Sequence, residues 1–156
     1  MDGKCQEFMN SPLDDFELID AVCCRLVDKE REMGAERLAP EERVVCYIWG
    51  ALGLLGNGSF QYFFENEMDP DAVAESLDLL GFPSIAACFR ETRNLFPEQI
   101  DQSNWDQTLA FMQQHESEFD SLAVRVLQSE KQIQASLATY IRSRPDFFVE
   151  GSNSIN

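Results

Sequence analysis

The sequence predicts an all-α fold: a single compact domain of six to eight helices around a central apolar helix at about residues 40–55. Helix-capping residues and helix-terminating glycines or prolines bracket nearly every segment. Apolar residues recur every three or four positions, and no stretch alternates as a strand does. With 156 residues, 44% of them hydrophobic and 11% aromatic, the chain can build a core without metals or disulfides. We expect residues 1–150 to form this domain and residues 151–156 to be a flexible tail.

The first expected helix starts at Ser11, an N-cap residue followed by Pro12 at the first helical position. Gly34 is a natural stop for it. Its apolar positions follow helical spacing and predict one buried stripe, made of Leu13, Phe16, Ile19, Val22, Leu26 and Val27.

The second expected helix begins near Pro40 and ends at Leu55, before the break that the run 56–58 predicts. Glu41 and Glu42 lie at the positive end of its dipole. Apolar residues surround its axis: Val44, Val45, Tyr47, Ile48, Trp49, Leu52, Leu54 and Leu55. A helix that is apolar on all sides belongs at the centre of a fold.

Four further helical segments follow. Ser59 is expected to cap a short aromatic helix over 60–66, and Asp69 with Pro70 opens a helix that ends at Gly81. The range 84–96 is the next helix, with its inward residues at Ile85, Cys88, Phe89 and Phe96. The pattern at 103–106 starts another, in which Trp105, Leu109 and Met112 share a face.

The last segment, 119–144, is expected to be helical, as one helix or as two helices broken near Ser129. Its inward positions are Leu122, Val126, Ile133, Leu137, Tyr140 and Ile141. Pro145 ends it. The residues that follow, Phe147, Phe148 and Val149, are expected to fold back onto the core.

The charge excludes several classes of function. With 28 Asp and Glu against 12 Lys and Arg, the net charge is −16, which argues against direct binding to nucleic acid or to anionic membranes. The longest apolar stretch, 44–56, is shorter than the roughly 20 residues that cross a bilayer. Met1 and Asp2, with Glu7 close behind, lack the basic start of a signal peptide. We therefore expect a cytoplasmic protein.

Catalytic, cofactor and metal motifs are not evident. There are five cysteines, no C-x-x-C pair and one histidine, so zinc and thioredoxin-like sites lack their ligands. We expect buried, reduced thiols at four positions: Cys23, Cys24, Cys46 and Cys88. His115 reads as a surface residue at a helix end. No nucleotide, serine hydrolase or zinc protease motif occurs, so we expect no enzyme, no cofactor and no metal.

Acidic residues cluster in two stretches. The range 41–78 carries eight acids against the single Arg43, and 98–120 carries six acids without Lys or Arg, which together account for −13 of the net charge. Either these acids solubilise the surface, or a rigid scaffold holds them in an array that a basic protein recognises. The candidate partner-binding residues are Glu65, Glu67, Asp69, Asp71, Glu75, Asp78, Glu98, Asp101, Asp106, Glu116, Glu118 and Asp120. Calcium binding by Glu65, Glu67, Asp69 and Asp71 is the weaker alternative to capping, because the spacing lacks the EF-hand pattern.

A short motif spans the break after the second expected helix and the aromatic helix that follows it. Its matching residues are Asn57, Gly58, Phe60, Gln61, Phe63, Phe64 and Asn66. They resemble the N-G-G-F-x-Q-F-F-x-N signature of the bacterial DNA-mimic family of Neisseria type, and the resemblance extends over about 39–148. Ser59 stands where a second glycine is usual, and Gln61 follows Phe60 without the usual intervening residue.

The resemblance implies an all-helical fold and, for the member that typifies the family, an acidic surface that occupies the DNA-binding site of a transcription factor. The motif itself also has a structural interpretation. Gly58 and Asn57 would allow positive φ at the turn, the aromatic residues would fill the core, and Gln61 and Asn66 would hydrogen-bond the exposed helix ends.

The leading hypothesis is therefore a non-enzymatic acidic protein that binds a basic, DNA-binding protein such as a transcription factor and competes with nucleic acid. The first alternative is an immunity or inhibitor protein that neutralises a basic toxin or nuclease. The second alternative is a small-ligand binder or enzyme that uses a polar site near Asn57, Gln61 and Asn66.

Overall fold

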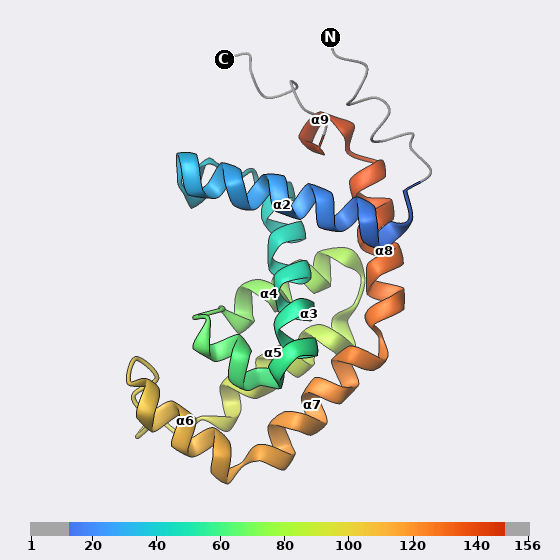
Figure 1. Ribbon diagram of the computed structural model, residues 1–156. Coiled ribbons are helices and arrows are strands. Elements are labelled where there is room, and N and C mark those ends of the chain that lie inside the picture. Colours follow the sequence, from blue (N-terminus) through green and yellow to red (C-terminus); the bar gives the residue numbers. More distant parts are fainter. Residues whose placement is uncertain (1–12, 149–156) are drawn as a thin grey trace. The chain divides into compact units, whose positions relative to one another are not determined.

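The computed structural model describes residues 13–148, which form helices joined by short turns and contain no strand (Figure 1). The elements in chain order are α2 (Asp15–Met33), the 3-10 turn η1 (Ala35–Arg37), α3 (Pro40–Glu65), α4 (Pro70–Leu80), α5 (Pro83–Leu95), α6 (Trp105–Gln114), α7 (Glu116–Gln128), α8 (Glu130–Arg142) and α9 (Pro145–Phe148). This confirms the all-α prediction. None of the helices in the described range is long and apolar enough to span a bilayer.

The contacts between residues divide the chain into two compact units. Among the described residues, unit 1 contains those up to Trp49 and those from Lys131 onward, and unit 2 contains Gly50–Glu130. Helix α3 starts in unit 1 and continues into unit 2. A single cooperative domain over 1–150 remains a prediction, and the predicted tail at 151–156 lies outside the described residues.

The chain's two tryptophans allow a direct test of that prediction, since Trp49 belongs to unit 1 and Trp105 to unit 2. Because α3 is continuous between the units, we expect both to unfold in one cooperative transition. Trp49→Phe and Trp105→Phe variants each leave one fluorescent reporter. Thermal unfolding followed by fluorescence should give the same midpoint as circular dichroism in both variants. Separate midpoints would show two independently folding units.

Helix α2 starts later than the sequence suggests. Its N-cap is Asp14, whose side chain accepts a hydrogen bond from the Glu17 amide at 2.8 Å, while Glu17 reaches back to the Asp14 amide. The predicted cap, Ser11 with Pro12, lies outside the described residues. A complete capping box satisfies two amides at once, which explains why the helix begins here. The predicted stop at Gly34 is confirmed.

The buried face of α2 also differs in part from the prediction. Phe16 is 52% exposed and Val27 is 42% exposed, whereas Leu18 is buried with Ile19. The Phe16 ring instead lies against Trp49 of α3, edge to face, with 5.3 Å between ring centroids. Unit 1 is completed by α8 and α9, whose Ile133, Leu137, Ala138, Ile141 and Phe148 are buried. The expectation that the segment after Pro145 packs inward is confirmed for Phe148, while Val149 lies outside the described residues.

Glu42 is nearly fully buried at the start of α3, at 2% exposure. One carboxylate oxygen accepts hydrogen bonds from the Ala39 amide at 2.9 Å and from Lys29 Nζ at 2.9 Å. The expected interaction with the helix dipole is therefore accompanied by a local cap and by an ion pair with α2.

Unit 2 is built around a cluster of phenylalanine rings. Phe60 and Phe63 of α3 are fully buried and lie 5.6 and 5.5 Å from the Phe89 ring of α5. Phe119 of α7 contacts Phe96 at 5.4 Å. The cluster joins the second half of α3 to α5 and α7, in keeping with the expectation that the motif aromatics form core.

The remaining helix boundaries agree closely with the sequence. Asp69 caps α4 and Gly81 ends it in the left-handed conformation, and Asn104 caps α6. The open question at 119–144 is resolved as two helices, with the break at Ser129 between α7 and α8.

The expectation of four buried thiols is wrong for three of them. Cys88 is buried, Cys23 and Cys46 are partly exposed, and Cys24 is exposed, all as free thiols. Apolar neighbours in the sequence place a cysteine in a helix, but they do not decide which side of that helix is covered.

Candidate functional site

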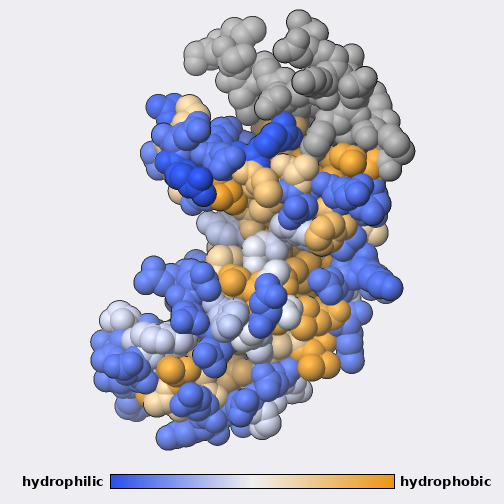
Figure 2. Space-filling model, viewed as in Figure 1, coloured by the Kyte–Doolittle hydropathy of each residue, from blue (hydrophilic) through white to orange (hydrophobic). Residues whose placement is uncertain are grey.

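The surplus negative charge is concentrated in unit 2. Residues 50–130 contain 14 Asp and Glu against three Arg, a net charge of −11, while the rest of the chain has 14 against nine, a net charge of −5. All twelve candidate partner-binding acids belong to unit 2. Eleven of them are exposed, and Asp71 is partly exposed. Figure 2 shows hydrophilic residues interspersed with smaller hydrophobic patches on the visible face.

Two of the candidate acids are neutralised by arginines. Within the helix pair α4 and α5, Asp71 forms an ion pair with Arg93, and Asp78 forms one with Arg90 at 2.6 Å. Both pairs are substantially exposed, so each contributes little to stability. They do reduce the net charge that these two carboxylates present to a partner.

Three other candidate acids have local structural roles. Asp69 accepts the Asp71 amide at the start of α4, and Asp101 accepts the amide and the hydroxyl of Ser103. The Ser103 hydrogen bonds lower the pKa of the exposed Asp101 carboxyl. Glu118 lies 3.2 Å from His115 Nδ1, and the histidine ring stacks on Phe111. Among the described residues, no group of three or more potential ligands is arranged to hold a metal ion.

Six of the candidate partner-binding acids lack a side-chain partner among the described residues, and we call these six the open carboxylates. In the described part of the chain these side chains have no hydrogen bond or ion pair with another residue: Glu65, Glu67, Glu75, Glu98, Asp106 and Glu116. Each is exposed, so its full charge faces solvent. That the open carboxylates and the other candidate acids form one contiguous face remains a prediction.

The family-like motif lies at a kink inside α3. Helical geometry is interrupted at Gly58 and Ser59, two residues after the predicted break began. The positive φ, 58° with ψ −160°, belongs to Ser59, while Gly58 is extended at φ −167°. The expectation that Gly58 supplies positive φ is therefore wrong. A glycine is needed at 58 for a different reason, since an added Cβ would lie 2.3 Å from the Tyr62 ring.

Ser59 occupies a backbone region that is nearly exclusive to glycine, at a cost of roughly 1–3 kcal/mol. Its hydroxyl donates a hydrogen bond to Asp120 Oδ1 of α7 at 2.8 Å. We expect Ser59→Gly to raise the free energy of unfolding by about 1 kcal/mol, because relief of strain exceeds the loss of one exposed hydrogen bond.

Ser59→Ala is the matched control for this prediction. It removes the hydrogen bond to Asp120 and keeps the strain, so it should lower the free energy of unfolding by about 0.5–1 kcal/mol. Urea denaturation of the two variants beside the parent chain measures both effects. Destabilisation by Ser59→Gly would show that the bond to Asp120 outweighs the strain.

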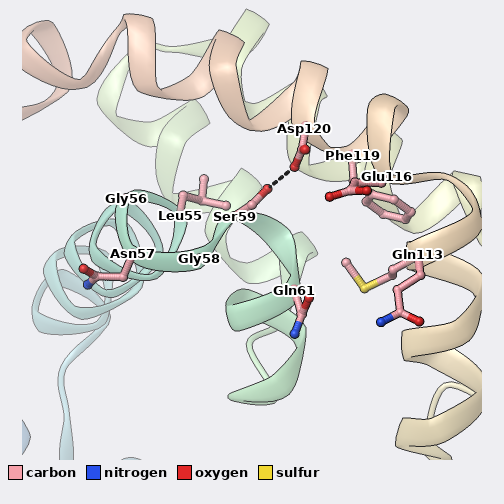
Figure 3. Close-up of a pocket in the computed structure, with 11 residues that line it drawn as sticks. Leu55, Gly56, Asn57, Gly58, Ser59, Gln61, Gln113, Glu116, Phe119 and Asp120 are labelled. Atoms are coloured by element: carbon pink, nitrogen blue, oxygen red, sulfur yellow. Dashed lines mark hydrogen bonds between the residues drawn. The ribbon is translucent and has the colours of Figure 1, made fainter.

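A pocket of about 520 Å³ opens beside this kink, between α3 and the junction of α6 and α7 (Figure 3). The apolar residues Leu55, Met112 and Phe119 contribute to its lining and are at most 5% exposed. The polar residues that line it are Asn57, Ser59, Gln61, Gln113, Glu116 and Asp120. Figure 3 shows the side chains of α6 and α7 facing the kink, with the Ser59–Asp120 hydrogen bond across one side.

The structure brings together only part of the polar site that the sequence suggested. Gln61 lines the pocket and is exposed, and it forms no hydrogen bond with a described residue, so its predicted bond to a helix end is absent there. Asn57 Nδ2 donates to the Gly53 carbonyl, and Asn66 Nδ2 donates to the Tyr62 carbonyl. Asn66 thus has the expected helix-end role and is not among the pocket-lining residues.

Sequence reasoning did not place most of the other lining residues at this site, and three of them show why. Gln113 and Met112 face it from α6, and Ser59 ties the kink to α7. No local signal identifies them, because their juxtaposition depends on how α6 and α7 return to α3. The i,i+4 spacing of Glu116 and Asp120 was the one available hint, since it places both carboxylates on one side of α7.

Comparison of the sequence with known proteins identifies the family of this chain. The sequence profile of the family described as DMP19-like protein matches residues 36–144, which include the kink motif and every candidate acid. No curated protein and no solved structure matches the chain. The match covers well over half of the sequence and confirms the resemblance to the DNA-mimic family. The chain belongs to the DMP19-like protein family.

Proposed function

We propose that the chain is a non-enzymatic interaction protein whose acidic unit 2 binds a basic, DNA-binding protein such as a transcription factor and competes with nucleic acid. The observation that carries the proposal is the net charge of −11 within residues 50–130, six of whose carboxylates are open. Family membership supports it, because the DNA-mimic kind of protein is generally non-enzymatic and binds DNA-binding proteins. The proposed location is the cytoplasm, with the partner.

The physical basis is the long range of the field from a set of fixed carboxylates. Glu75 lies one helical turn from both Asp71 and Asp78, so α4 presents a row of three acids on one side, in which Glu75 is unpaired among the described residues and the other two are paired with arginines. Such a row attracts the cationic groove that would otherwise hold phosphates. Leu79, which is 74% exposed next to this row, offers apolar contact area that pure charge lacks.

The proposal is tested by capture and displacement. The immobilised chain is incubated with lysate at low salt and eluted at high salt, and the eluted protein is identified and purified. That protein is then bound to a fluorescent DNA duplex, and the chain is added in increasing amounts. We expect the duplex to be released, and the release to weaken as salt screens the charges. Polyglutamate at equal total charge is the control, and displacement no better than polyglutamate would contradict specific mimicry.

The inhibitor alternative is distinguished by the identity of the eluted protein. If the eluted protein is a basic nuclease, its hydrolysis of DNA is measured as the chain is added. Complete inhibition at one equivalent of the chain would support the inhibitor alternative in place of DNA mimicry. If the eluted protein is instead a non-enzymatic regulator that the chain displaces from its DNA site, the leading proposal is supported.

The pocket beside the kink favours a second candidate function, the binding of a small cationic ligand. Buried Met112 and Phe119 offer apolar contact there, and the carboxylates of Glu116 and Asp120 offer charge. Arginine amide is a suitable probe, since its guanidinium pairs with carboxylates. Calorimetric titration should show binding that Glu116→Gln weakens and Glu75→Gln leaves unchanged. Equal weakening by both variants would indicate only a diffuse charge effect.

A further inference from the structure

Helices α2 and α3 pack against each other in unit 1 along a series of side-chain contacts. Phe16 lies against the Trp49 ring, and Asp20 accepts a hydrogen bond from Trp49 Nε1 at 3.4 Å. Further along α2, Lys29 pairs with Glu42 at 2.9 Å. The residue numbers rise along α2 as they fall along α3. These contacts therefore lie on either side of the region where α2 crosses the first half of α3 (Figure 1).

Cys23 and Cys46 occupy the middle of this series. Cys23 follows Asp20 by one helical turn, and Cys46 precedes Trp49 by one turn. The two side chains are near enough to shift each other's ionisation, and both are partly exposed. We propose that Cys23 and Cys46 are a site of reversible oxidation, at which a peroxide converts the facing thiols into an intramolecular disulfide between α2 and α3.

The pair differs from the other described cysteines in its reactivity. Interaction with the Cys46 thiol lowers the pKa of Cys23, against the opposing effects of burial and of Asp20, and the same interaction raises the pKa of Cys46. Desolvation raises the pKa of Cys24, and nearby Asp20 and Cys23 add to this rise. Because the thiolate is the reactive form, Cys23 is the expected site of first attack.

The chemistry balances with one equivalent of hydrogen peroxide. The Cys23 thiolate attacks one peroxide oxygen, the O–O bond breaks, and the sulfur becomes a sulfenic acid while the released hydroxide takes up a proton to become water. The Cys46 sulfur then attacks the Cys23 sulfur and displaces a second water. The two thiols lose two electrons in total, and the peroxide is reduced to two waters. A dithiol reductant reverses the reaction by thiol–disulfide exchange.

The bond would tie α2 covalently to the first half of α3 and enclose η1. Closing this loop restricts the unfolded chain, so oxidation should stabilise unit 1 against unfolding. The site lies outside the acidic unit 2, and the inference does not depend on the proposed partner. A failed capture experiment leaves it standing, and a failed oxidation experiment leaves the proposed function standing.

The test uses the full chain, reduced, desalted and treated with hydrogen peroxide. Remaining thiols are alkylated with N-ethylmaleimide and the protein is analysed by mass spectrometry. We expect two fewer N-ethylmaleimide adducts than in the reduced chain, a mass before alkylation that is lower by about 2 Da for the lost hydrogens, and full reversal by dithiothreitol. Because Cys23 and Cys24 are adjacent, Cys24→Ser is used in the peptide mapping to assign the link to Cys23 alone.

Two further variants give the proposal a sharp control. In Cys46→Ser the disulfide should be lost, and dimedone should instead trap the sulfenic acid on Cys23. In Cys88→Ser the Cys23–Cys46 link should form as in the parent chain, since Cys88 belongs to unit 2. Circular dichroism confirms that each variant is folded. A link through Cys24 or Cys5, a covalent dimer in place of an internal link, or unchanged thiols would each overturn the proposal.

Discussion

Phe60→Ala is expected to lower the free energy of unfolding by about 3–5 kcal/mol, the usual range for removing a fully buried aromatic ring. Phe60 has no exposed surface, and its ring contacts Phe63, Phe89 and Phe119. The loss combines the transfer of the ring to water with a cavity that the surrounding rings cannot fill. Urea denaturation of the variant and of the parent chain, with midpoint and slope fitted for each, measures the change.

Phe16→Ala is the matched control, because it removes the same atoms from a position that is 52% exposed. That ring contacts Trp49 edge to face, so its removal should cost less than about 1.5 kcal/mol. Equal effects from the two substitutions would show that the phenylalanine cluster does not organise unit 2. A changed denaturant slope would show instead that Phe60 limits residual structure in the unfolded chain.

Features set by neighbouring residues were predictable from the sequence. Asp69 with Pro70 marks the start of α4 and Gly81 marks its end, because a cap, a fixed φ and a left-handed residue act within one turn. The buried positions of α5, including Cys88 and Phe89, followed from their helical spacing. Each of these signals is contained within a few residues of chain.

Features that depend on a second helix were not predictable in this way. The motif suggested a break in α3, but the break falls at Ser59, where a hydrogen bond to Asp120 from another helix accompanies the unusual backbone. Likewise, the exposure of Cys23 and Cys46 depends on how far α2 covers α3. Periodicity identifies the side of a helix, and tertiary packing decides how completely that side is covered.

For the candidate acids too, their location was predictable from the sequence, whereas their pairing with residues of another helix was not. Their sequence clustering correctly indicated where the charge lies, since unit 2 carries −11 of the −16. It could not show that Arg90 and Arg93 of α5 lie across from Asp78 and Asp71. An arginine 12 or 22 residues away becomes a partner only after α4 and α5 have packed together.

Because the open carboxylates are not paired with arginines in the described part of the chain, they are the candidate acids whose charge reversal should affect partner binding most. Reversing Glu65, Glu67 and Glu75 to Lys together is expected to weaken binding of the captured partner by about 100-fold or more at low salt, since each lost charge pair contributes on the order of 1 kcal/mol. All three residues are exposed and lack a partner in the described structure, so the fold should be preserved. Fluorescence anisotropy across a series of salt concentrations measures the affinity, and circular dichroism monitors the helices.

The matched control makes the same change of charge in unit 1. Glu30, Glu32 and Glu36 are also exposed, and reversing them to Lys changes the net charge by the same amount. If the proposed surface lies in unit 2, this variant should bind within a few-fold of the parent chain, because the reversed charges make no direct pair with the partner and salt screens what remains of their field. The two triple variants have the same net charge. A difference between their affinities for the partner therefore reports the position of the reversed charges and not their number.

Salt dependence separates the remaining interpretations. A partner held by a defined set of carboxylates should lose affinity steeply as salt rises, and the unit 2 triple should flatten that dependence because fewer pairs are left to screen. The unit 1 triple should retain the steep dependence of the parent chain. Equal losses and equal slopes in both triples would mean that the partner responds to net charge alone, and the acidic residues of unit 2 would then be a solubilising surface.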